Sequence, residues 1–101
     1  MDLTDAISTV RKELIEEGGM LHRIALYEGI DLKAANRLKT ALKSLADYYK
    51  DKNDIPKKLA AAFIDLTPLF ERSIDMYSEI EQEQIEDIRN DIVSLAVDLF
   101  S

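Results

Sequence analysis

The stretch that decides the fold is DLKAANRLKTALKSLADYYK, residues 31–50. Because an α-helix has 3.6 residues per turn, apolar side chains spaced alternately by three and four lie on one of its faces. Here that face holds Ala35, Leu38, Leu42, Leu45 and Tyr49. Asp31 is a suitable N-cap, and Gly29 a suitable stop for a preceding helix. The stretch predicts an amphipathic helix over residues 31–50 with one buried side.

The preceding residues show the same period. One helical face collects Leu3, Ile7, Val10, Leu14, Leu21 and Ala25. Thr4 or Asp5 can cap the start of this helix. Gly18 and Gly19 each cost about 1 kcal/mol inside a helix, yet the apolar phase continues past them. We expect one helix to about residue 28, bent at the glycines; alternatively, the pair allows close approach of another helix or a ligand.

After residue 50 the chain predicts two further helices. Pro56 suits the first turn of the third, which turns Leu59, Ala62, Phe63 and Leu66 inward. Thr67-Pro68 is the next boundary, and from there to Ser101 no glycine or proline interrupts the chain.

The apolar side chains of residues 68–100 share one sector, which favours a single last helix about 50 Å long. The alternative is a turn at residues 78–84, where Ser78 and Glu81 resemble a capping box and Ile80 falls out of phase.

These patterns predict an all-α fold, because no window alternates as a β-strand would. With short connections, we expect a single domain over residues 1–101, built as an antiparallel up-down bundle of about four helices with a long C-terminal helix.

Negative charge is confined to the end of the chain. Residues 1–72 hold twelve acidic and twelve basic residues, whereas residues 73–101 hold eight acidic residues and only Arg89 as a base. The formal charge of −7 therefore belongs to the last segment. At a spacing of four, an acidic ridge forms along one helix: Glu79, Glu83, Asp87 and Asp91. Three uses are open for it: pairing with the basic residues 31–50, binding a basic partner protein, or solubility.

Composition excludes several classes of function. An acidic chain is a poor partner for nucleic acid or an anionic membrane. No apolar run is long enough to span a bilayer. There is no cysteine, and the first residues are acidic where a signal peptide would be basic. We therefore expect a cytoplasmic protein.

No motif for catalysis, a metal or a cofactor is present, so we expect no enzyme activity and no cofactor. His22 is the sole histidine, and neither a P-loop nor a Gly-x-Gly-x-x-Gly motif occurs. Histidine phosphotransfer domains are helical bundles with one exposed His, but their usual Lys and Gly after the His are absent here. The similarity therefore covers one residue and an architecture.

The expected function is that of a non-enzymatic interaction or regulatory module, which we expect to be a homodimer and to bind a protein partner through the acidic ridge. A second, apolar contact stripe would consist of Ile15, Gly19, His22 and Leu26. One alternative is a small-ligand site near Gly18, with Glu17, Glu81 or Gln84 as its polar group. Phosphorelay through His22 is the other.

Overall fold

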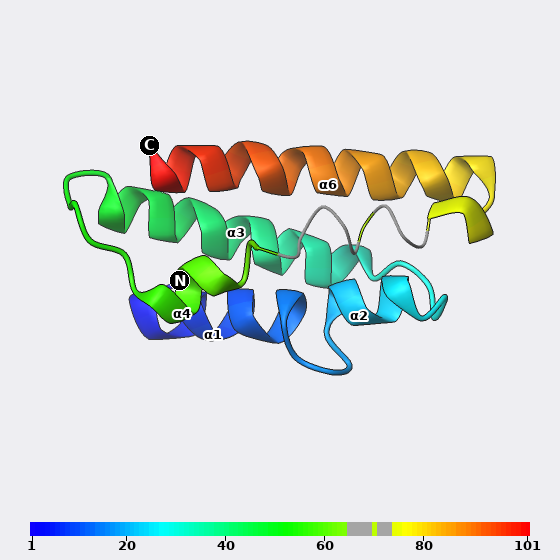
Figure 1. The fold of residues 1–101 in the computed structure, drawn as a ribbon, viewed down its shortest axis with the longest axis horizontal. Coiled ribbons are helices and arrows are strands. Elements are labelled where there is room, and N and C mark those ends of the chain that lie inside the picture. Colours follow the sequence, from blue (N-terminus) through cyan, green and yellow to red (C-terminus); the bar gives the residue numbers. More distant parts are fainter. Residues whose placement is uncertain (65–69, 71–73) are drawn as a thin grey trace.

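The computed structural model describes residues 1–64, 70 and 74–101. In that part of the chain the elements are helical and connected by turns (Figure 1). They are α1 (Leu3–Leu14), α2 (Met20–Ala25), α3 (Leu32–Tyr49), α4 (Lys57–Ala61), the 3-10 helix η1 (Ile74–Met76) and α6 (Glu79–Phe100). The expected all-α class is confirmed.

Helix α3 is the centre of the molecule and follows the prediction closely. Asp31 caps it, because its carboxylate accepts a hydrogen bond of 3.0 Å from the Ala34 N–H. The predicted inward residues are all buried: Ala35, Leu38, Leu42, Leu45 and Tyr49. One side of α3 packs against α1 and another against α6, so this helix joins the two halves of the core.

The arrangement differs from an antiparallel bundle of four long helices, which is not confirmed. α1 and α2 run along the molecule in one direction, and α3 and α6 both run in the opposite direction (Figure 1). Side by side, α3 and α6 are therefore parallel. Lys39 and Lys43 of α3 border a groove with Asp91 and Leu95 of α6, in the same order along both helices. Neighbouring helices that run in the same direction need a long crossover connection, and residues 50–78 join α3 to α6.

The predicted single helix from a cap at Thr4 or Asp5 to about residue 28 is wrong. α1 ends at Leu14 and α2 begins at Met20, with a turn between them. Gly18 adopts φ +79°, a left-handed conformation that a helix cannot contain. The turn rotates α2, so that its buried side differs from the apolar face predicted by continuing α1. Met20 and Ile24 are buried together with the predicted Leu21, whereas Ala25 is only half-buried.

The favoured single helix over residues 68–100 is also wrong. The chain breaks at Ser78, where the alternative turn was expected to begin, but residues 79–84 of that turn belong to α6. α6 begins at Glu79 behind an N-cap at Ser78. The Ser78 hydroxyl accepts from the Glu81 N–H at 3.2 Å, and the Glu81 carboxylate in turn accepts from the Ser78 N–H at 3.4 Å. This capping box stabilises a helix start at that point. Ile80, which was out of phase, is 72% exposed.

The third predicted helix is short in the described residues. Pro56 is the N-cap of α4, and Leu59 and Ala62 are buried as expected, with Phe63 half-buried. Leu66 and the Thr67-Pro68 boundary lie outside the described residues. No helix in the part of the chain that the structure describes is long and apolar enough to cross a membrane.

Candidate functional site

The predicted acidic ridge exists as one exposed line along α6. Glu79, Glu83, Asp87 and Asp91 all belong to this helix and are all exposed. Glu79 lies in the first turn, where a carboxylate interacts favourably with the positive end of the helix dipole. α6 therefore tolerates an acidic face at its start.

One member of the ridge is neutralised inside the molecule. The Lys39 ammonium of α3 lies 2.8 Å from the Asp91 carboxylate. Among the described side chains, no cation lies within ion-pair distance of Glu79, Glu83 or Asp87. The predicted pairing of the basic helix with the ridge is thus present at one position, and three carboxylates still face solvent.

The predicted apolar stripe of Ile15, Gly19, His22 and Leu26 does not form one helical face. The turn after α1 separates Ile15 from the other three residues. Ile15 and Leu26 are exposed, His22 is half-buried, and Gly19 is buried. The structural premise of the stripe is therefore wrong, and a role of these residues in partner binding stays a prediction.

Gly19 is needed for a close backbone approach within the chain itself. A Cβ atom at this position would lie 1.9 Å from the Lys12 carbonyl oxygen of α1. The alternative interpretation of the glycine pair, close approach rather than a simple bend, is thus the better one. The approaching group is the Lys12 carbonyl in the last turn of α1, so the neighbour is the preceding helix of the same chain.

Glu13 is a buried charged residue of the core that the sequence patterns did not single out. Its side chain accepts a 3.1 Å hydrogen bond from the Met20 N–H at the start of α2. The other carboxylate oxygen lies 3.4 Å from the Arg37 guanidinium of α3. Because Gly19 has no side chain with which to cap α2, Glu13 supplies the acceptor from a distance. Glu13 follows the buried Ala6 and Val10 at helical spacing, and this spacing could have predicted that it faces the core.

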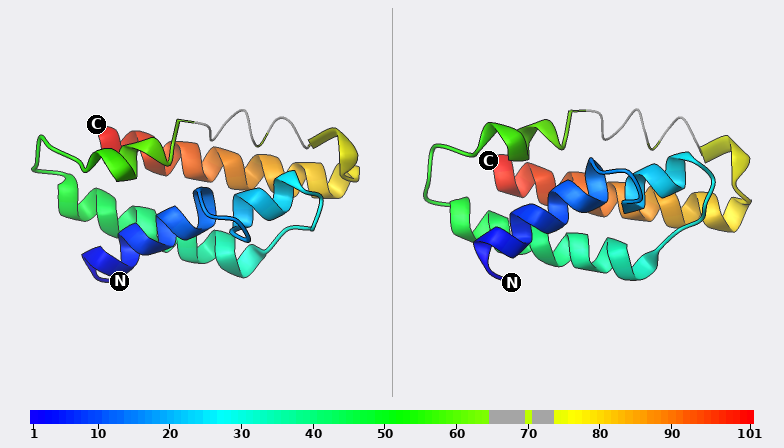
Figure 2. Two further views of the ribbon diagram at one scale, coloured as in Figure 1. Left: turned by 60° about the horizontal axis from the view of Figure 1, so that its bottom comes forward. Right: turned by 90° about the horizontal axis from the view of Figure 1, so that it is seen from below.

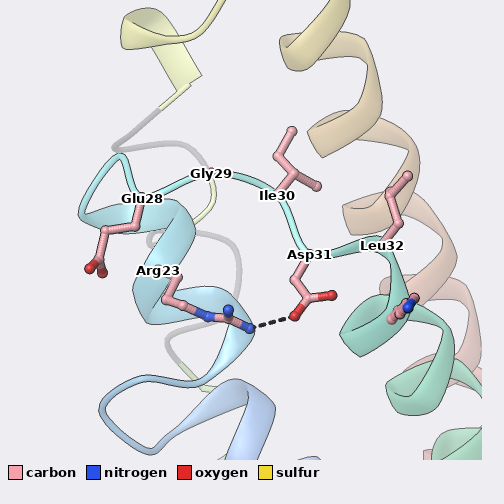
Figure 3. Close-up of a pocket in the computed structure, with 7 residues that line it drawn as sticks. Arg23, Glu28, Gly29, Ile30, Asp31 and Leu32 are labelled. Atoms are coloured by element: carbon pink, nitrogen blue, oxygen red, sulfur yellow. Dashed lines mark hydrogen bonds and ion pairs between the residues drawn. The ribbon is translucent and has the colours of Figure 1, made fainter.

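The turn between α2 and α3 contains a second ion pair. Arg23 and Asp31 point toward one another, and their charged groups lie 2.8 Å apart, whereas Glu28 points away (Figure 3). The hydrogen bond from the Ala34 N–H, together with that from Arg23, lowers the pKa of Asp31 below its ordinary value. These residues border a shallow surface depression of about 450 Å³. Glu28 and Lys33 border the same depression, so two of its four charged side chains, Arg23 and Asp31, are engaged with each other.

Tyr27 occupies an unusual backbone position at the end of α2. The Tyr27 N–H donates to the Ile24 carbonyl and the Glu28 N–H to the Arg23 carbonyl, the two bonds of a Schellman motif. Tyr27 has φ +60° at the position where glycine is usual. For a residue with a side chain, this left-handed conformation costs about 1–2 kcal/mol.

Tyr77 packs against this strained turn and hydrogen-bonds to its backbone. Its ring centre lies 6.0 Å from that of Tyr27, and its hydroxyl donates a 2.8 Å hydrogen bond to the Ile24 carbonyl. Burial raises the pKa of the Tyr77 phenol above its ordinary value. Tyr77 thereby ties the segment before α6 to the end of α2. No sequence pattern pairs residues 24 and 77.

No group of candidate metal ligands is found among the described residues. Within residues 1–64, 70 and 74–101, no three acidic or histidine side chains are grouped so that they could hold a metal ion. Glu17 and Gln84 are exposed, and Glu81 is engaged in the capping box. Three surface depressions, beside Asp31, Asn36 and Ser94, are bordered neither by Gly18 nor by Glu17, Glu81 or Gln84.

Comparisons with known proteins place the chain in no family. No protein-family model matches it, and no curated protein or solved structure does so either. Functional inference therefore rests on the surface of this molecule alone.

Proposed function

We propose that this chain is a non-enzymatic interaction module that binds a basic partner protein through the acidic ridge. The observation that carries the proposal is that Glu79, Glu83 and Asp87 extend exposed over two turns of α6, and that among the residues the structure describes only Asp91 of the ridge has a cationic partner, Lys39. Like charges at this spacing repel by a few tenths of a kcal/mol per pair. A basic partner would remove that repulsion and would be attracted from a distance.

Charge reversal on the ridge tests the proposal. The double variant Glu83→Lys with Asp87→Lys should keep the fold, because both side chains are exposed. Its affinity for a lysine-rich peptide, measured by fluorescence anisotropy, should fall much more than that of a control with the same change of charge. Glu16→Lys with Glu17→Lys is that control, since both of these residues are exposed in the turn after α1. Equal losses would mean that net charge alone attracts the peptide, and the ridge proposal would fail.

We also propose that the chain is a homodimer in a cytoplasmic setting. Support for self-association comes from an exposed apolar line on the C-terminal half of α6, with spacings of four and three: Val93, Val97 and Phe100. A second copy could cover this line and leave the ridge accessible. The exposed lysines of α3, Lys33 and Lys43, offer the competing contact, in which the ridge of one copy meets α3 of the other.

Light scattering coupled to size exclusion at low and high salt separates these two dimers. A dimer that persists in high salt indicates the apolar line, and Val97→Glu should then dissociate it. A dimer that dissociates in salt indicates contact between the ridge and α3. A monomer under both conditions would contradict the homodimer.

A further inference from the structure

One end of the molecule exposes large apolar side chains from three different elements. They are Leu26 and Tyr27 after α2, Met76 of η1 and Ile80 in the first turn of α6, and they are 50–72% exposed. Both views in Figure 2 place the turn after α2, η1 and the start of α6 at this end. We refer to these four residues as the end patch.

The end patch lies over Tyr77 and the capped start of α6. Beneath it, the buried Tyr77 contacts the Tyr27 ring and hydrogen-bonds the Ile24 carbonyl. Met76 directly precedes Tyr77, and Ile80 follows three residues later, just inside the capping box of α6. Backbone hydrogen bonds therefore hold the chain at Tyr27, beside Met76 and around Ile80, an arrangement that favours a pre-organised contact surface.

Within the patch, Tyr27 combines a strained backbone with an exposed side chain. It holds a left-handed backbone conformation at a position where glycine would be unstrained. Tyr27 is nevertheless 50% exposed, so burial in the isolated chain offsets only part of that strain. Strained residues of this kind cluster at functional sites, and tyrosine is among the commonest anchors of protein interfaces.

Acidic residues border the patch on every element that contributes to it. Glu28 follows Tyr27, Asp75 precedes Met76, and Glu79 precedes Ile80; all three are exposed. Glu79 is also the first residue of the acidic ridge, so apolar and acidic surfaces are continuous here. This combination is complementary to a partner with apolar side chains on one side and basic ones beside them. A second copy docked on the same patch would instead bring two acidic rims together.

We propose that the end patch docks a basic amphipathic helix of a partner protein. Apolar side chains of that helix cover Tyr27, Met76 and Ile80, and its lysines or arginines face Glu28, Asp75 and the ridge. The inference rests on the proposed function and deepens it: the ridge attracts any basic chain, and the end patch selects those with an apolar face.

Two peptides of identical composition test the proposal with the full chain. Each has about 18 residues, or five helical turns; in one, Leu and Lys follow helical spacing, and in the other the same residues are scrambled so that no apolar face forms. By fluorescence anisotropy, the amphipathic peptide should bind at least about tenfold more tightly.

A matched pair of isoleucine variants locates the contact. Ile80→Ser should reduce binding of the amphipathic peptide about tenfold and leave the scrambled peptide unaffected. Ile64→Ser is the control, because Ile64 is equally exposed, at 76% against 72%, but follows α4. Far-UV circular dichroism of both variants verifies that they fold.

The possible failures are distinguishable. Equal binding of the two peptides, or equal effects of the two variants, overturns the end patch and leaves the proposed function intact. If neither peptide binds, both the patch and the proposed function are overturned. A dimer of the chain that Ile80→Ser dissociates would make a second copy the occupant, and this also overturns the proposal.

Discussion

At the turn between α1 and α2 the left-handed backbone position belongs to Gly18, whereas at the turn between α2 and α3 it belongs to Tyr27. The first turn is also closed internally, because Gly19 fits against the Lys12 carbonyl and Glu13 caps α2 from within the core. The second turn leaves Leu26 and Tyr27 exposed. The second turn is held internally as well, by Tyr77 and the Arg23–Asp31 pair. Under the proposed docking, the first turn serves stability alone, whereas the second also presents a strained tyrosine to the partner.

The contrast between the two turns can be tested first at Gly19, where we expect the largest loss of stability. Gly19→Ala forces the Lys12 carbonyl away from a Cβ atom, and we expect a loss of about 3 kcal/mol in the free energy of unfolding, measured with urea. Gly18→Ala is the control. It is strained at φ +79° but meets open space, so about 1 kcal/mol is expected. Equal costs would show that the close approach to α1 is unimportant.

A smaller loss is expected at Glu13. Glu13→Ala leaves the Met20 N–H without its acceptor in the core and should cost about 2 kcal/mol. Glu13→Gln keeps an acceptor oxygen and should lose about half as much, since only the charge opposite Arg37 disappears. The exposed Glu16 provides a reference, because Glu16→Ala should stay within about 0.5 kcal/mol of the parent. If Glu13→Ala left the free energy of unfolding unchanged, Glu13 would not act as the cap of α2.

The second turn can be probed through its support, Tyr77. Tyr77→Phe removes the hydrogen bond to the Ile24 carbonyl and should cost about 1 kcal/mol near neutral pH. Because the folded pKa of Tyr77 lies above the ordinary value of 10.0, the stability that its phenol contributes is complete below pH 10. That contribution is lost as the pH rises through the raised pKa. The melting temperatures of the parent protein and of Tyr77→Phe should therefore converge at strongly alkaline pH. A difference in melting temperature that stays constant with pH would contradict this role of the Tyr77 phenol.

The smallest effect on stability is expected at Tyr27 itself. Tyr27→Gly relieves the left-handed strain but loses the contact with the Tyr77 ring and adds freedom to the unfolded chain, so the changes nearly cancel. We expect the free energy of unfolding to change by less than about 0.5 kcal/mol while binding of the amphipathic peptide weakens. A large loss of stability would place Tyr27 in the same class as Gly19 and would remove the contrast between the turns.

Local patterns predicted those features that depend on neighbours along the chain. The 3-4 spacing and Asp31 located α3 to within a residue or two at each end, and the Ser78 and Glu81 pair located the start of α6, although the single long helix was favoured. The ridge was also predictable, because residues four apart on one helix must share a face. Extrapolating the apolar phase across Gly18 was wrong, since a left-handed residue resets the phase after it.

The sequence by itself thus determined an all-helical chain, the buried face of α3 and an acidic line on the last helix, because each follows from the geometry of one helix. Only the tertiary structure decided that α3 and α6 lie parallel, that Lys39 pairs with Asp91, that Glu13 caps α2, and that Tyr77 reaches Ile24. These contacts join residues 7 to 53 positions apart, and their partners are selected by how the helices pack, which helical periodicity does not encode.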